Sequence, residues 1–271
     1  MSVYIDNFET IFGVKNNIQA LRNKVLELAI QGKLVEQDPN DEPASELVKQ
    51  IKAERERLVK EGKIKKQKAL APIEEDEIPF EVPDSWEWVR LESCSDMYTG
   101  NSIAKTVKLN KYTKIKDGYN YIATKDVGFD HVIDYSNGVK IPYDEKDFRY
   151  AEKDSTLLCI EGGSAGRKIG YLKEKVCFGN KLCSFHPISM NTLYLYYYLQ
   201  SKFFIAIFKD NINGIIGGVS ISKLKEVICP IPPLAEQHRI VQKVESLMSL
   251  IDQMENKLKV KTDLIEKMAD V

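Results

Sequence analysis

Residues 156–172, TLLCIEGGSAGRKIGYL, bring together glycines and a basic pair directly after an apolar run. A P-loop would require GxxxxGK[ST], and a dinucleotide fingerprint would require GxGxxG at the start of a helix. Gly162, Gly163 and Gly166 have neither spacing, and KIGYL alternates like a strand. The pattern therefore disfavours a nucleotide site. Two compatible interpretations remain: a hairpin turn that needs φ > 0, or a surface turn whose backbone and Arg167-Lys168 approach phosphate.

Other residues that could carry catalysis show no suitable arrangement. His131, His186 and His238 lie far apart in the sequence, and the acidic residues 74–76 fall in a proline-rich stretch. The segment IPPL at 231–234 lacks the polar residue and the aromatic of the [DN]PP[YF] motif found in amino-methyltransferases. We therefore predict a chain without a catalytic site and without a cofactor of its own.

The cysteines are odd in number and show no CxxC spacing, which disfavours a zinc site. The first residues, MSVYIDNFETIFG, have neither a basic n-region nor a long apolar segment, so we expect no secretory signal. We accordingly expect a cytoplasmic protein with reduced, structural thiols. The residues concerned are Cys94, Cys159, Cys177, Cys183 and Cys229.

The charge is distributed unevenly, although the formal net charge is only −1. Residues 91–228 hold 19 Lys/Arg and 15 Asp/Glu, a surplus of four positive charges, and lysines alternate there with tyrosines. Such a surplus shows where a polyanion would bind, but a lysine-rich solvated surface explains the same pattern.

The segments around this central stretch have helical patterns. Residues 17–31 place apolar residues three and four apart and precede Gly32, which is typical of a helix end. A second helix is predicted from Pro43 to residue 61, capped by Asp41 or Glu42, with a charged outer face in solvent. Residues 63–85 are predicted to be an extended linker because of their prolines and charge runs.

The central segment predicts short strands, from WEWVRL at 86–91 to VICPIPP at 227–233. One packed helix is expected over 193–209, followed by a glycine-containing turn at 213–222. The pattern favours an α+β (mixed α/β) fold with one globular domain. We expect three regions: residues 1–85 as a helical region with a linker, 86–231 as the globular domain, and 232–271 as a C-terminal helix.

The last region has a heptad pattern with charges between its apolar positions, which predicts a coiled coil. The helix is too long for its apolar face to be buried against one small domain, so we expect a dimer or partner contact along it. The positions that we assign to this contact are Leu21, Val25, Leu28, Ile240, Val244, Leu247, Ile251, Met254 and Leu258.

Two stretches resemble the specificity (S) subunits of type I restriction–modification systems. They are residues 21–91, with QGKLV and PDSWEW, and residues 230–258, with PPLAEQHRI. YIATKDV, LLCIEGGSAG and NKLCSF are similar to weaker motifs of the same family. The chain departs from the family pattern in having one recognition domain, not two, and so resembles a half-length S protein or a fragment of one.

The resemblance implies sequence-specific binding of double-stranded DNA at a split site, with helices that space two recognition domains and dock methyltransferase (M) subunits. The restriction (R) subunit would join through the M subunits, which would leave the S-adenosylmethionine and ATP sites outside this chain. A homodimer would restore two recognition domains. A coiled-coil adaptor without DNA binding and a DNA-modifying enzyme remain the alternatives.

We expect the DNA-binding residues on the loops 98–106, 124–130, 163–168, 178–182 and 214–223. Lysine and arginine there should mainly contact phosphates, whereas Thr124, Asn180 and Ser220 are candidates for reading bases. The full set is Thr99, Asn101, Lys105, Thr124, Lys125, Gly163, Ser164, Arg167, Lys168, Asn180, Lys181, Ser220 and Lys223.

Overall fold

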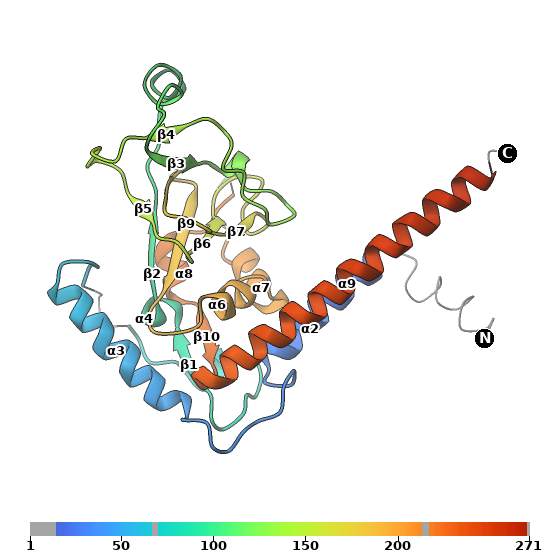
Figure 1. Cartoon of the computed structure of the whole chain (residues 1–271). Helices are drawn as coiled ribbons and strands as arrows, with labels where there is room; N and C mark the ends of the chain where they lie inside the picture. The colour runs from blue at the N-terminus through green and yellow to red at the C-terminus, as the bar shows by residue number, and fades with distance from the viewer. Residues whose placement is uncertain (1–14, 67–69, 213–216, 270–271) are drawn as a thin grey trace.

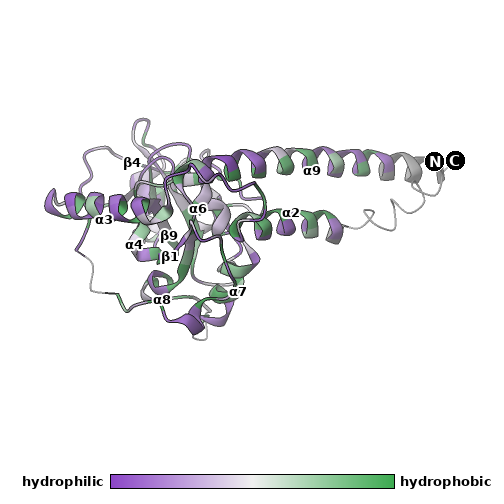
Figure 2. Ribbon diagram, turned by 90° about the horizontal axis from the view of Figure 1, so that it is seen from below, coloured by the Kyte–Doolittle hydropathy of each residue, from purple (hydrophilic) through white to green (hydrophobic). Residues whose placement is uncertain are grey.

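The computed structural model describes residues 15–66, 70–212 and 217–269. Two helices, α2 (Lys15–Ile30) and α9 (Leu234–Ala269), extend side by side from a globular body in both overall views (Figures 1 and 2). They run antiparallel, because Arg22 of α2 bonds to Asp252 and Glu255, far along α9. The predicted C-terminal helix is thus confirmed, with an antiparallel partner inside the same chain.

The apolar faces of the helix pair are covered to different extents. On α9 the described heptad positions are buried at Ile240, Val244 and Ile251 and half-buried at the other three positions. On α2 the most deeply buried side chains are Ile18, Leu26, Ala29 and Ile30, whereas the predicted Leu21, Val25 and Leu28 are half-buried. The pair therefore leaves part of its apolar surface accessible to solvent.

Helix α3 (Ala44–Lys60) packs on the body through Leu47 and Ile51. Its N-cap is Pro43, without a side-chain cap, so the predicted capping by Asp41 or Glu42 is wrong. The carboxylate of Asp41 instead binds the guanidinium of Arg239 on α9. The predicted helix end is confirmed by Gly62, whose φ of 70° is the left-handed conformation that favours glycine.

The segment after α3 crosses the body with one short 3₁₀ turn, η1 (Glu75–Glu77). Arg90, which is buried, holds this segment in place: its guanidinium donates to the carbonyls of Ala71 and Pro72 and forms an ion pair with Glu77 at 2.8 Å. The predicted linker is therefore attached along part of its length.

The described residues of the body form three sheets. Strands β1 (Glu87–Arg90) and β10 (Ile228–Ile231) form an antiparallel pair that brings the two ends of the body together. A four-stranded antiparallel sheet has the order β2-β9-β6-β7, and a second four-stranded sheet has the order β4-β3-β8-β5, with β3 and β8 parallel. Their bounds are β2 (Ser95–Thr99), β3 (Tyr119–Ile122), β4 (Lys140–Ile141), β5 (Tyr150–Ala151), β6 (Thr156–Cys159), β7 (Ile169–Tyr171), β8 (Val176–Phe178) and β9 (Leu182–Pro187).

Short helices connect these strands. The single helix predicted over 193–209 is wrong: the structure has two helices, α6 (Thr192–Tyr198) and α7 (Lys202–Asp210). The break lies at Ser201, whose hydroxyl accepts the backbone N–H of Phe204 and begins α7. The remaining short elements are α4 (Leu91–Cys94), α5 (Lys105–Val107), a π-helical turn η2 (Lys108–Tyr112), η3 (Thr124–Asp126) and α8 (Ile221–Glu226).

The largest buried apolar cluster continues from α2 and α3 through α6 and α7 to the first turns of α9. Two smaller clusters fill the space around the second sheet. The mixed helix-and-sheet class is thus as predicted. Among the described residues, none of the helices is both long and apolar enough to span a bilayer.

Candidate nucleic-acid interface

The glycine turn forms a hairpin. Strands β6 and β7 pair antiparallel on either side of it, and two of its glycines have positive φ, 84° at Gly162 and 71° at Gly166. A Cβ added at Gly166 would lie 2.6 Å from the ring of Phe208, so α7 closes one side of the turn. Gly163 is exposed and has open space where its Cβ would be. The predicted strand–turn–strand is confirmed.

Several loops that are distant in sequence meet at this turn through backbone hydrogen bonds. The N–H of Gly162 donates to the carbonyl of Gly217, and the N–H of Ile160 donates to the carbonyl of Lys181. The neighbouring loop continues the arrangement, since Gly179 donates to Ile122 and Asn101 donates to Phe178. We call the loops 99–101, 122–126, 160–168, 178–182 and 217–220 the loop surface.

Basic side chains lie on and beside this surface. Arg167 and Lys168 both lie over the ring of Phe129, at 5.1 and 5.0 Å from its centroid. Arg167 also donates to the carbonyl of Gly163, and Lys168 donates to the carbonyl of Thr124 at 3.1 Å. Arg167 is exposed and Lys168 is half-buried, so the exposed Arg167 is the member of the pair that solvent reaches more freely.

The other predicted basic residues are exposed, and three of the four form surface ion pairs. Lys181 pairs with Glu161, Lys223 with Glu226, and Lys125 with Asp126, at 3.1, 3.2 and 3.7 Å. Lys105 begins α5 and is exposed as well. Because exposed ion pairs contribute little free energy, a phosphate can replace the carboxylate of Glu161 or Glu226 at small cost. Asp126 differs, because its carboxylate is buried and accepts the N–H of Ala123.

The predicted polar residues divide into engaged and available side chains. The amide of Asn101 donates to the carbonyl of Asp147 and accepts the N–H of Arg149, so it holds two loops together. Thr99 accepts the guanidinium of Arg149 with its backbone carbonyl. The hydroxyl of Ser220 accepts the N–H of Lys223 at the start of α8. The side chain of Asn180 faces solvent, the backbone of Gly163 is exposed, and the side chains of Thr124 and Ser164 are half-buried.

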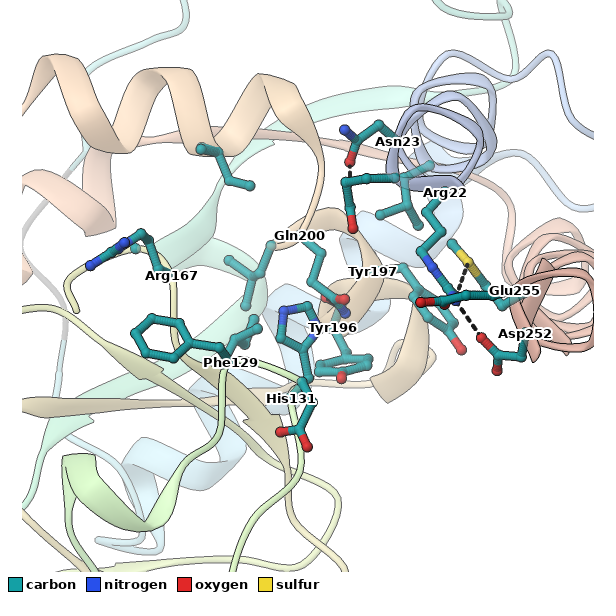
Figure 3. Close-up of a pocket in the computed structure, with 18 of the residues that line it drawn as sticks. Arg22, Asn23, Phe129, His131, Arg167, Tyr196, Tyr197, Gln200, Asp252 and Glu255 are labelled. Atoms are coloured by element: carbon teal, nitrogen blue, oxygen red, sulfur yellow. Dashed lines mark hydrogen bonds and ion pairs between the residues drawn. The ribbon is translucent and has the colours of Figure 1, made fainter. Parts of the chain in front are cut away.

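A cleft of about 870 Å³ separates the loop surface from the helix pair (Figure 3). Phe129, His131 and Arg167 line one side, and Arg22, Asp252 and Glu255 line the other. Three basic residues (Arg22, Arg167, Lys209) and three acidic residues (Asp130, Asp252, Glu255) line the whole cleft. Their charges cancel, so the cleft as a whole does not favour a polyanion.

The predicted loop 124–130 includes Phe129, but sequence reasoning singled out neither Phe129 nor the adjacent His131. Phe129 is 59% exposed, and His131 has a φ of 66°, which is rare for a residue other than glycine. Burial lowers the pKa of the His131 imidazole, which therefore stays neutral at physiological pH. An aromatic between Gly128 and Asp130 was the available signal, because turn residues on both sides place it in a loop.

A second polar group lies where α9 begins, and we call it the junction. Glu236 is only 1% exposed, and its carboxylate accepts the indole N–H of Trp86 at 2.9 Å and the amide of Gln37 at 2.6 Å. Burial raises the pKa of Glu236 against the effect of these two bonds. Gln237, fully buried, bonds to the N–H of Asn191 and the carbonyl of Pro232. Together with the ion pair between Asp41 and Arg239, these contacts give the PPLAEQHR and PDSW motifs a structural role: they hold the start of α9 against the body.

These observations agree with comparisons to known proteins. A family model described as "Type I restriction modification DNA specificity domain" matches residues 83–261, well over half of the chain. The chain belongs to this family. Among curated relatives, the chain is 33% identical over 267 residues to the type I restriction enzyme EcoAI specificity subunit of Escherichia coli and 32% identical over 266 residues to the EcoEI specificity subunit. It covers 43% and 44% of their lengths, so it spans less than half of each.

Solved structures of this family share the fold. The HsdS subunit from Thermoanaerobacter tengcongensis superposes with a TM-score of 0.52 at 18% identity, over 90% of this chain and 51% of that one. A chain from a study of complex assembly and conformational transition in the type I R-M system gives 0.55 at 18% identity, over 93% and 55%. The specificity-domain fold is therefore shared, and the predicted resemblance to S subunits is confirmed.

Proposed function

We propose that this chain is the DNA-recognition component of a type I restriction–modification system. It reads one half of a split target in double-stranded DNA and directs M subunits, and through them the R subunit, to that site. The observation that carries the proposal is the loop surface: the glycine turn and four other segments meet and present solvent-facing basic and polar side chains beside an antiparallel helix pair.

The chemistry of the loop surface fits the two kinds of contact that such recognition needs. Exposed Arg167 and Lys181 supply phosphate contacts, which fix the register of a protein on the duplex. Asn180, exposed between β8 and β9, has an amide that can both donate and accept at a base edge. The assignment of these and the other loop residues to DNA contacts is part of the proposal.

The helix pair supports a homodimer. Leu21, Val25 and Leu28 on α2 and Leu247 and Met254 on α9 are half-buried in the single chain. A second copy would cover this remaining surface and, with two-fold symmetry, would place two recognition domains on a palindromic split site. Light scattering after size-exclusion chromatography is expected to give the mass of a dimer. A stable monomer both with and without DNA would contradict this part of the proposal.

We assign no catalytic step and no cofactor to this chain, and we place it in the cytoplasm with its partners. All five cysteines are buried free thiols. Burial raises the pKa of the Cys94 thiol to about 12 and that of Cys177 to about 12. Such thiols stay protonated at neutral pH and are poor nucleophiles.

Methylome sequencing tests the proposal most directly. Cells that carry the chain with its M partner should gain methylation at one split sequence, and cells with the M partner alone should not. The purified chain should then bind a duplex with that sequence in a gel shift, with an affinity that falls steeply as salt rises. Unchanged methylation together with equal binding to all duplexes would overturn the assignment.

A further inference from the structure

Residues 105–116, KTVKLNKYTKIK, hold five lysines and no acidic residue. They include α5 and η2 and stand out beyond β3 and β4, at the end of the body farthest from β1 and β10 (Figure 1). We call these residues the arm. Such a density of one charge on a projecting segment repels itself, so it requires an anchor and suggests an anionic ligand.

The arm is anchored and not merely extended into solvent. Tyr112 is 4% exposed and packs edge-on against Phe148, with ring centroids 5.7 Å apart. Lys111 forms an ion pair with Glu145 at 2.7 Å, and Lys140 donates to the carbonyl of Lys116 at 3.0 Å. The base of the arm is therefore fixed on the second sheet, which reduces the entropy lost when its side chains bind a ligand.

The anchoring uses two of the five lysines and leaves three available. Lys111 is neutralised by Glu145, and Lys108 is half-buried over the ring of Tyr121, at 4.8 Å from its centroid. Within the described part of the chain, no ion pair joins the other three to an acidic residue, and all three are exposed. These residues are Lys105, Lys114 and Lys116.

The arm is continuous with the loop surface. The hydroxyl of Tyr121, which lies under Lys108, donates to the carbonyl of Asn101 on that surface. Burial lowers the pKa of Lys108, and the charges of Asp126 and Lys125 in the neighbouring turn shift it in opposite directions. A duplex held by the loop surface therefore has its backbone near the arm.

We propose that the arm is a phosphate clamp, which grips the DNA backbone outside the base pairs read by the loops through Lys105, Lys114 and Lys116. This inference rests on the proposed DNA-binding function and adds a sequence-independent part to it. Lysine suits this role because it is a point charge that contacts phosphate without reading a base.

A protein ligand fits the arm less well. Its exposed apolar side chains are Val107 and Leu109, at 45% and 54% exposure. The whole arm has only 12 residues, fewer than the 20 to 30 per side of a typical stable protein interface. Protein interfaces are also depleted in lysine. The positive charge of the arm therefore favours DNA as its ligand.

The test compares two triple variants of the full chain. K105Q/K114Q/K116Q removes the free charges of the arm, whereas K52Q/K60Q/K65Q removes three exposed lysines on and after α3. Binding is measured over a series of salt concentrations to two 40-bp duplexes, one with the sequence found by methylome sequencing and one of arbitrary sequence.

The arm variant should bind both duplexes more weakly by the same factor, on the order of tenfold near 0.1 M salt. Its salt slope should fall by roughly 0.9 for each phosphate that the variant no longer neutralises. The α3 variant should retain both the affinity and the slope. Equal losses of affinity in both variants, or an arm variant that binds arbitrary DNA normally but assembles poorly with M subunits, would overturn the clamp. Failure of the wild-type chain to distinguish the two duplexes would instead overturn the proposed recognition function.

Discussion

The junction and the loop surface use polar residues in opposite ways. At the junction, Glu236 and Gln237 are almost completely buried and bonded within the chain. On the loop surface, Arg167, Asn180 and Lys181 face solvent. Buried polar groups are costly when unpaired, so they select one geometry, whereas exposed groups keep hydrogen-bonding capacity for a ligand. The junction therefore fixes where α9 leaves the body, whereas the exposed side chains of the loop surface can change at little cost in stability.

Removing the indole at the junction should have the largest effect on stability. Trp86→Ala deletes a side chain that is 4% exposed and removes one of the two N–H donors to the buried Glu236 carboxylate, leaving only that of Gln37, so we expect a loss of about 3–5 kcal/mol. Trp86→Phe keeps an aromatic ring and should cost less. Urea unfolding of the full chain measures both, and a loss below about 1 kcal/mol for Trp86→Ala would show that the junction does not hold α9 against the body.

Two glycines of the hairpin turn distinguish a position packed against α7 from one that faces solvent. Gly166→Ala combines a positive φ with a contact against Phe208 and should destabilise the chain by about 1–3 kcal/mol. Gly163→Ala meets no atom within 4 Å and should leave stability within about 0.5 kcal/mol of the wild type. Thermal unfolding compares the matched pair, and equal stability of the two variants would mean that the turn is not held by α7.

Loss of the basic pair should affect binding more than folding. Arg167→Ala/Lys168→Ala removes the charges that lie over Phe129, and we expect DNA affinity to fall on the order of tenfold with a shallower salt dependence. The circular dichroism spectrum should remain that of the folded chain, since the hydrogen bonds removed, to the carbonyls of Gly163 and Thr124, belong to surface loops. Unchanged DNA binding would leave the turn with a purely structural role.

The smallest effect is expected in the helix pair. The hydrogen bond from Arg22, and after it the one from Lys259, lowers the pKa of Glu255. The ionised carboxylate therefore stabilises the fold at pH values above its unfolded pKa. This contribution is lost as the pH falls through the folded pKa. Glu255→Gln should cost about 0.5 kcal/mol at pH 7, because the pair is partly solvated. In urea unfolding, the difference from wild type should shrink as the pH falls below the unfolded pKa of about 4.3, and it should vanish once the pH is below the lower folded pKa. A difference that persists there would point to packing and not to charge.

Local signals explain which parts of the fold were predictable. Regular spacing and a following glycine indicated where α2 and α3 end, a short apolar run indicated β6, and alternation indicated β7. The break between α6 and α7 was missed because apolar residues lie on both sides of Gln200-Ser201-Lys202, and the capping role of Ser201 depends on one hydroxyl. Tertiary contacts also decided that Asp41 pairs with Arg239 and does not cap α3.

The candidate site was predictable as a set of loops and not as individual roles. The turn at 160–168 and the loop at 178–182 do meet, although they belong to different segments of the sequence. Sequence pattern could not show that the Asn101 amide is engaged by Asp147 and Arg149. It also could not show that β8 and β9 join different sheets across a connection of only three residues, which exposes Asn180.

The pairing of β1 with β10 has a consequence for the exchange of recognition domains. Glu87 lies opposite Ile231 and Arg90 opposite Ile228, so the chain enters and leaves the body at the same place. A segment between these strands can be replaced by another without altering the distance between the points where it is joined. A chimera that takes residues 91–227 from a relative should therefore keep this helix pair while acquiring the relative's DNA preference, as one interchangeable cassette.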